Sequence, residues 1–151
     1  ELLRSIHIKG RDNARTPMQW DASENAGFST GTPWLKVNPN YPDINVEQAL
    51  ADEQSIFYYY QQLIRLRHDH ELVVYGRYEL LLEDHPEVYA YSRTLEGETW
   101  YIYCSFADHD IHVPISHATT DHVIGNYADT NTSDGLTLRP YESVVFRTFD
   151  A

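Results

Sequence analysis

One polar stretch near the start of the chain has the composition of a ligand-binding loop. Residues 10–21 read GRDNARTPMQWD, so Arg11 and Arg15 lie four residues apart beside acidic and amide side chains. A guanidinium is planar and donates paired hydrogen bonds, which suits carboxylates and vicinal hydroxyls. Pro17 prevents a helix from continuing through this stretch. The residues alone therefore predict a rigid polar loop near a site. They leave open a plainer interpretation, in which Arg–Asp pairs only hold the loop.

Composition and charge limit the classes of function. The chain has 151 residues, of which 42% are hydrophobic and 13% aromatic, enough for one domain or for a small domain plus part of another. A net charge of -12 disfavours nucleic acids and anionic membranes, whereas it suits a neutral ligand such as a sugar. The apolar run Leu80–Leu82 is too short to span a bilayer. Because the chain begins with Glu1 and not Met, we expect it to start inside a longer protein.

The single cysteine and the eight histidines predict neither a nucleophile nor a metal site. Cys104 ends a strand-like run and is interpreted as a structural thiol, and a lone thiol favours a cytoplasmic protein. Two histidine pairs have close spacing but no convincing third ligand, namely His68 with His70 and His109 with His112. No metal and no cofactor are expected. Asn131 begins a weak glycosylation pattern.

The pattern along the chain changes twice. Residues 1–45 contain several prolines and glycines and show no helical or strand period, so they are predicted to be irregular, with four aromatic residues that favour packing: Trp20, Phe28, Trp34 and Tyr41. Asn45 and Gln48 resemble a capping box for a short helix through Asp52. A longer amphipathic helix is expected to follow and to end in basic residues, with an apolar face of Ile56, Tyr59, Tyr60, Leu63 and Ile64.

Residues 74–150 are predicted to be all-β. Short alternating runs separated by turn residues favour an antiparallel sandwich of about 75 residues. The expected strands are 78–83, 88–94, 100–105, 111–115, 122–124, 136–138 and 143–149.

The polar loop and its continuation resemble a known family. Residues 10–21 closely resemble the motif of oligo-1,6-glucosidases, dextran glucosidases, trehalose-6-phosphate hydrolases and related α-glucosidases of the α-amylase superfamily. Similar continuations follow in the same order at residues 25–28, 31–34, 37–41, 44–47, 55–60, 63–64, 66–67 and 138–142. The resemblance covers nearly the whole chain and is weakest over residues 105–133.

The resemblance implies a mainly β fold with α-helices, in two parts. Residues 1–72 are expected to be the C-terminal part of a catalytic (β/α)8 barrel, comprising an active-site loop and the last helix. Residues 73–151 are expected to be a C-terminal antiparallel β-sandwich domain. The rest of the barrel is then the partner of this chain within one polypeptide.

The resemblance also implies a retaining α-glucosidase that cleaves terminal non-reducing α-glucosyl linkages of short oligosaccharides, with α-1,6 linkages favoured. Retention requires two carboxyl groups about 5–5.5 Å apart. In the family these groups precede the polar loop, so no catalytic residue is expected in this chain, which alone should be inactive. Asp12, Asp21 and Glu24 are interpreted as loop-structuring. Arg11 is expected to bind substrate at the non-reducing-end glucose. For Arg15 that role is weaker, and bracing of the loop is favoured.

Two other classes of function remain open for residues 73–151. One is a carbohydrate-binding module, and the other is a purely structural domain that covers the barrel. Trp20 and Trp34 can in principle stack on a sugar, although packing against the barrel is the favoured interpretation. Linkage preference does not follow from these residues.

Overall fold

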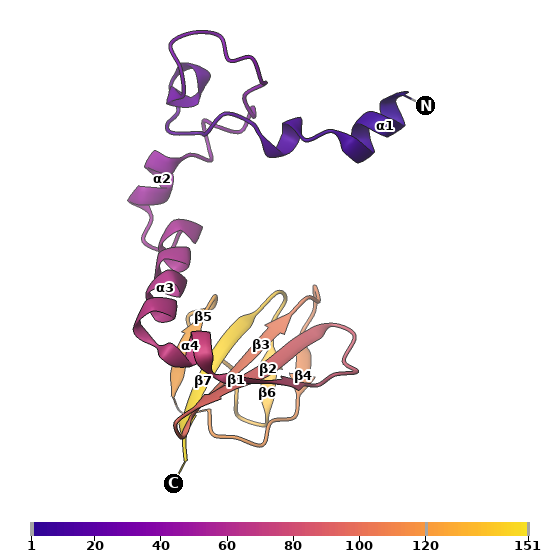
Figure 1. Cartoon of the computed structure of the whole chain (residues 1–151), viewed down its shortest axis with the longest axis vertical. Coiled ribbons are helices and arrows are strands. Elements are labelled where there is room, and N and C mark those ends of the chain that lie inside the picture. Colours follow the sequence, from indigo (N-terminus) through magenta and orange to yellow (C-terminus); the bar gives the residue numbers. More distant parts are fainter. Residues whose placement is uncertain (1, 120, 151) are drawn as a thin grey trace. The chain divides into compact units, whose positions relative to one another are not determined.

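The computed structural model describes residues 2–119 and 121–150, except for the side chains of residues 7 and 13. The chain divides into two compact units, Glu1–Gln62 and Leu63–Ala151. Figure 1 shows the first unit as helices and irregular segments and the second as mainly strands. Each unit is described separately below.

The first unit contains more helix than the sequence pattern predicted. α1 (Leu2–Lys9) and two 3₁₀ turns, η1 (Asp12–Ala14) and η2 (Glu24–Gly27), lie within the stretch expected to be irregular. The prediction of no helix before residue 45 is therefore wrong. α1 is only 8 residues long, and its large apolar side chains, such as Leu2 and Ile8, are exposed, so no buried face marks it in the sequence.

The two predicted helices in the middle of the chain are confirmed. α2 (Val46–Ala51) begins with the predicted cap, because the Asn45 side chain accepts a hydrogen bond from the Gln48 amide at 2.9 Å. α3 (Ile56–Asp69) ends with Arg67 and His68, where cations complement the helix dipole. None of its residues is buried, and Ile56 on the expected apolar face is 86% exposed. Four residues of the expected apolar face, Ile56, Tyr60, Leu63 and Ile64, therefore remain exposed.

A further short helix, α4 (Glu71–Tyr75), was not expected from the sequence. The sequence pattern predicts that the long helix ends at His68 and that the β region begins at residue 74. Leu72 of α4 is buried, and the Gly76 amide donates a hydrogen bond to the Leu72 carbonyl at 2.9 Å, which ends the helix. A single buried side chain in 5 residues gives no readable period.

The second unit consists of two antiparallel sheets. The larger has the strand order β1-β2-β3-β7-β5, and the smaller pairs β4 with β6. The bounds are β1 (Arg77–Leu81), β2 (Val88–Leu95), β3 (Glu98–Ser105), β4 (Ile111–Val113), β5 (His122–Gly125), β6 (Leu136–Leu138) and β7 (Ser143–Phe149). The antiparallel β region and all of its expected strands are confirmed, with ends that shift by one or two residues.

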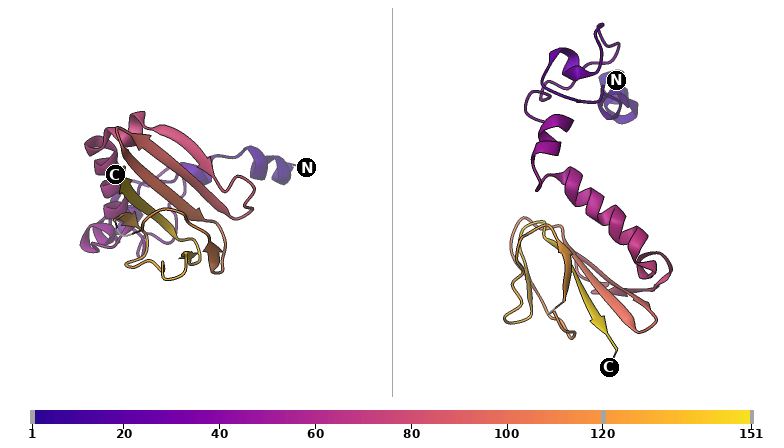
Figure 2. Two further views of the ribbon diagram at one scale, coloured as in Figure 1. Left: turned by 90° about the horizontal axis from the view of Figure 1, so that it is seen from below. Right: turned by 90° about the vertical axis from the view of Figure 1, so that its left-hand side faces the viewer.

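One hydrophobic core joins the two sheets. Figure 2 shows them as two layers, and the buried residues of both belong to one cluster. The larger sheet contributes Val88, Ala90, Tyr103, Val144 and Phe146, and the smaller sheet and its approach contribute Ala107, Ile111, Val113, Leu136 and Leu138. Alternate residues of each strand therefore point inward, as the period-two pattern requires.

No helix among residues 2–119 and 121–150 is long and apolar enough to cross a membrane.

Candidate functional site

The two arginines of the polar loop lie at the two ends of the 3₁₀ turn η1. The Ala14 amide donates to the Arg11 carbonyl at 3.0 Å, and the Arg15 amide donates to the Asp12 carbonyl at 3.1 Å. Both arginine side chains are exposed, and within the described part of the chain neither has a hydrogen bond or an ion pair. The interpretation in which Arg–Asp pairs hold the loop therefore has no support here. Both guanidinium groups remain available to a ligand or to another part of a protein.

A side-chain amide holds the base of the loop that follows. Gln19 Nε2 donates to Asn40 Oδ1 at 3.0 Å and to the Ile44 carbonyl at 2.5 Å. The start of α2 adds two backbone contacts, because the Val46 amide donates to the Gln19 carbonyl at 2.9 Å and the Glu47 amide to the Trp20 carbonyl at 3.0 Å. Residues 19–46 therefore form a loop whose two ends are joined.

A turn near the start of this loop contains three consecutive residues in the left-handed region. The φ angles of Asn25, Ala26 and Gly27 are 54°, 59° and 65°. Ala26 is fully buried, and its carbonyl accepts hydrogen bonds from the amides of Trp20 at 2.8 Å and Asp21 at 3.3 Å. Residues other than glycine adopt this conformation at a free-energy cost, which the surrounding contacts must offset. Specific contacts therefore hold this segment in a defined conformation, unlike a free surface loop.

Asp21 is the acidic residue around which this turn is formed. Its carboxylate accepts hydrogen bonds from the Ser23 hydroxyl and from the Ser23 amide, the latter at 2.8 Å. The bond from the Ser23 side chain, followed by that from its backbone, lowers the pKa of Asp21. A Cβ at Gly27 would lie 2.5 Å from an Asp21 carboxylate oxygen, so this position requires glycine. These contacts agree with the expectation that Asp21 has a structural role.

Two aromatic residues of the loop are exposed in this chain. Trp34 is 92% exposed and Trp20 is 50% exposed, and their predicted packing against the rest of the barrel stays a prediction. A hollow of about 370 Å³ lies beside the loop, lined by Thr16, Pro17, Met18, Gln19, Ile44, Asn45, Val46, Ala49 and Phe57. Its walls are the loop base and α2, and it does not contain Arg11 or Arg15.

Among the residues that the structure describes, no group of three or more His, Cys, Asp or Glu side chains is arranged to hold a metal ion. The Cys104 thiol is half-buried, and burial raises its pKa, which favours the unreactive protonated form. Neither feature adds a catalytic group to the loop.

The sequence predicted a site role for the two arginines, which stays a prediction, but it did not predict the residues that shape the loop beside them. Gln19 and Asn40 are 21 residues apart, and no local pattern predicts that they meet. The dipeptide Ala26-Gly27 after Asn25 was a readable turn signal, since asparagine and glycine favour the left-handed region.

Comparison with known proteins places this loop in a family. Residues 1–76, half of the chain, match the model of the alpha amylase catalytic domain. The chain is 48% identical to an oligo-1,6-glucosidase of Halalkalibacterium halodurans over 96% of its own length.

The chain belongs to the alpha-amylase family.

Solved structures of family members are similar to this chain in fold. Trehalose-6-phosphate hydrolase of Bacillus licheniformis is 36% identical, with a TM-score of 0.87 over 99% of this chain and 28% of that one. An isomaltulose synthase of Erwinia rhapontici NX5, in complex with its natural substrate sucrose, is 39% identical, with a TM-score of 0.87 over 97% of this chain and 27% of that one. The chain spans about a quarter of the length of its curated relatives, 27% for the H. halodurans enzyme.

Proposed function

We propose that this chain supplies part of a retaining α-glucosidase that hydrolyses terminal non-reducing α-glucosyl linkages of short oligosaccharides, with α-1,6 linkages favoured. The observation that carries this proposal is the 48% identity to an oligo-1,6-glucosidase over 96% of the chain. Such identity over nearly all residues includes the polar loop and its shaped continuation. Function resides in a site and not in a fold, so this identity supports the proposal more strongly than the likeness of fold does.

In this proposal residues 1–72 complete a (β/α)8 barrel and residues 73–151 form a C-terminal β-sandwich domain. Support comes from the match of residues 1–76 to the catalytic domain and from the two antiparallel sheets that share one core. The remainder of the barrel is the partner within the same polypeptide. The single cysteine and the acidic net charge of -12 favour a cytoplasmic enzyme that binds neither nucleic acid nor membranes.

Arg11 is proposed to bind the non-reducing-end glucose. Its side chain is exposed and has no partner within the described residues, so it retains all of its donors for sugar hydroxyls and for a carboxylate of the barrel. Arg15 is kept as a second candidate for the same site. Neither arginine supplies the nucleophile or the acid/base, which retaining hydrolysis takes from two carboxyl groups.

The test is a comparison of the 151-residue chain with the complete enzyme expressed from the longer coding sequence. The complete enzyme should release glucose from isomaltose faster than from maltose or trehalose 6-phosphate. NMR of the first product should show the α-anomer, because a double displacement retains configuration. The chain alone should release no glucose above a buffer blank. A complete enzyme that yields β-glucose, or that prefers another of these substrates, would contradict the corresponding part of the proposal.

For residues 73–151 the structural role is favoured over a carbohydrate-binding module. The observation that favours it is an exposed apolar surface on the larger sheet, where Tyr78, Leu80 and Tyr89 are each 41–46% exposed.

A further inference from the structure

The segment that leads into β6 contains a tight turn at an aspartate–glycine pair. Asp134 is exposed, and its carboxylate has neither a hydrogen bond nor an ion pair within the described residues. An isolated bridge between Ser133 and Gly135 bends the backbone around it. Behind the turn, the Thr137 amide donates to the Asn131 carbonyl at 2.9 Å. Asp134 therefore lies at the tip of a short loop, outside the strands of both sheets.

The fold favours glycine directly after this aspartate. The φ angle of Gly135 is 85°, a left-handed value that other residues adopt at a free-energy cost. A Cβ at this position would also lie 3.2 Å from the Val113 carbonyl oxygen and 2.9 Å from Cε1 of the His112 ring. Because glycine has no side chain, its amide nitrogen is open to a neighbouring group. The pair Asp134–Gly135 thus combines an unbound carboxyl group with an accessible amide.

We propose that Asp134 is a site of spontaneous isoaspartate formation. The Gly135 nitrogen attacks Cγ of the protonated Asp134 carboxyl group, a C–N bond forms, and the amide proton leaves with the hydroxyl as water. The product is a five-membered succinimide. Water then adds to the ring carbonyl that came from the Asp134 main chain, and the bond from that carbon to the Gly135 nitrogen breaks. The main chain now continues through Cγ. One water leaves and one enters, so the reaction requires no oxidant, reductant or cofactor and leaves the mass unchanged.

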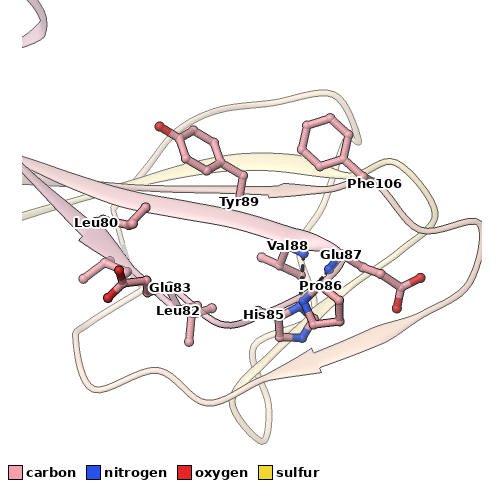
Figure 3. A pocket seen from close by; sticks show the side chains of 10 residues that line it. Leu80, Leu82, Glu83, His85, Pro86, Glu87, Val88, Tyr89 and Phe106 are labelled. Carbon is pink, nitrogen blue, oxygen red and sulfur yellow. Dashed lines mark hydrogen bonds between the residues drawn. The ribbon is translucent and has the colours of Figure 1, made fainter.

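A second exposed aspartate provides a structural contrast. Asp84 lies in the connection between β1 and β2 and is followed by His85 instead of glycine. The His85 amide donates to the Leu82 carbonyl at 2.9 Å. The His85 ring Nδ1 accepts from the amides of Glu87 at 3.2 Å and Val88 at 3.0 Å, and Figure 3 shows both bonds as dashed lines. The nitrogen that would attack is engaged and lies beside a fixed side chain, so Asp84 should remain aspartate.

The modification acts on the core through β6. An isoaspartyl residue at Asp134 adds one atom to the main chain shortly before Leu136, whose side chain, like that of Leu138, is fully buried. Leu136 pairs with Val113 in the smaller sheet. The added atom displaces either the turn or the strand, and a close-packed interior tolerates such a shift poorly. Isoaspartate should therefore destabilise the second unit. Asp134 and β6 both belong to that unit, so the reaction does not depend on the proposed glucosidase activity.

The experiment follows the purified 151-residue chain at physiological temperature and pH in water labelled with heavy oxygen. After transfer to ordinary water and digestion, peptide mass spectrometry should find one heavy oxygen atom at Asp134. Electron-transfer fragmentation should identify the isoaspartyl bond, because it cleaves the added backbone bond. Asp134 should incorporate the label at least about tenfold faster than Asp84, since only Asp134 is followed by glycine.

Three substitutions test the mechanism. Asp134→Glu should abolish incorporation of the label, because its longer side chain must close a less favourable six-membered ring. Asp134→Asn forms the same succinimide with loss of ammonia, and it should accumulate isoaspartate faster than the wild-type chain, since an amide needs no prior protonation. Asp84→Asn is the matched control and should remain mostly asparagine, because His85 follows it. Both aspartates are exposed, so none of these changes should prevent folding.

Melting temperatures connect the reaction to the core. The isoaspartyl form, separated from the unreacted chain by ion exchange, should have a Tm at least about 4 °C lower. Asp134→Glu incubated in parallel should keep its Tm. Equal melting of the two forms would overturn the effect on β6. Label that enters Asp134 no faster than Asp84, or isoaspartate that accumulates only in the urea-unfolded chain, would overturn the modification site itself.

Discussion

The His117 ring lies parallel to that of Tyr101, with ring centroids 3.7 Å apart and planes inclined by 8°. Its Nε2 is 2.8 Å from the Tyr103 hydroxyl, and its Nδ1 is 2.9 Å from the Ala118 carbonyl. Because a carbonyl only accepts, Nδ1 carries the proton and Nε2 accepts from Tyr103. His117 thereby attaches the segment between β4 and β5 to the inner side of the larger sheet.

This arrangement predicts an acid-sensitive attachment. Burial lowers the pKa of His117 below its ordinary 6.5, so the folded state favours the neutral ring. The unfolded chain then binds more protons in this range, and stability should be complete above pH 6.5 and decrease as the pH falls through the folded pKa. His117→Phe retains the stacked ring, loses about 1 kcal/mol with the hydrogen bond, and removes this pH dependence. Urea unfolding at pH 7.0 and 5.5 checks both effects. Parallel pH dependence in the two proteins would disprove the assignment.

A second prediction concerns the left-handed turn of the loop. Gly27→Ala introduces a Cβ 2.5 Å from the Asp21 carboxylate at a φ of 65°, so the Asp21–Ser23 contacts should break. The pKa of Asp21 should then rise towards its ordinary 3.8. NMR titration of the Asp21 carboxyl measures this change. Gly31→Ala is the matched control, because the nearest atom to its Cβ is 3.9 Å away. An unchanged Asp21 in Gly27→Ala would show that the turn does not depend on glycine.

A third prediction concerns the buried carboxylate of Glu142. Its oxygens accept from the Arg139 amide at 2.8 Å, from Nε at 2.9 Å and from Nη2 at 3.0 Å. Glu142 is 1% exposed, so Glu142→Gln weakens charge-assisted hydrogen bonds to a buried side chain and should cost about 1.5–3 kcal/mol of unfolding free energy.

Asp129 is the matched control for Glu142. It binds the same guanidinium at 2.8 Å, but its side chain is 83% exposed. Asp129→Asn should therefore cost about 1 kcal/mol or less. Unfolding followed by the fluorescence of the buried Trp100 compares the two variants. Equal losses would mean that burial does not decide the strength of these ion pairs.

A fourth prediction concerns the two arginines in the complete enzyme. If Arg11 binds glucose hydroxyls beside a barrel carboxylate, Arg11→Ala removes charge-assisted hydrogen bonds of about 1.5–3 kcal/mol each. It should lower kcat/KM by at least roughly 10². Arg11→Lys should restore little, because an ammonium lacks the paired donors.

Arg15→Ala is the comparison for Arg11. It should leave kcat/KM within about tenfold, since substrate binding is assigned mainly to Arg11. Melting temperatures of all three variants separate lost folding from lost binding. An Arg11→Ala enzyme with early melting but normal turnover would refute the assignment.

The sequence by itself determined the elements that are marked by a local pattern of capping, polar and apolar residues. The cap at Asn45, the period of α3 and the alternation of β2 are local patterns, so the short helix, the long helix and the antiparallel strands were predictable. The family also followed from local motifs such as residues 10–21. By contrast, α1 and α4 are too short to show a period, and they were missed.

Only the tertiary structure decided which distant residues meet. The contacts of Gln19 with Asn40, of His117 with Tyr101 and Tyr103, and of α4 with Trp100 join residues far apart in sequence. Alternation predicted that Tyr89 and Tyr91 share a strand face, but not whether that face is covered. Burial depends on what the rest of the chain places against a surface, and no period within a strand contains that information.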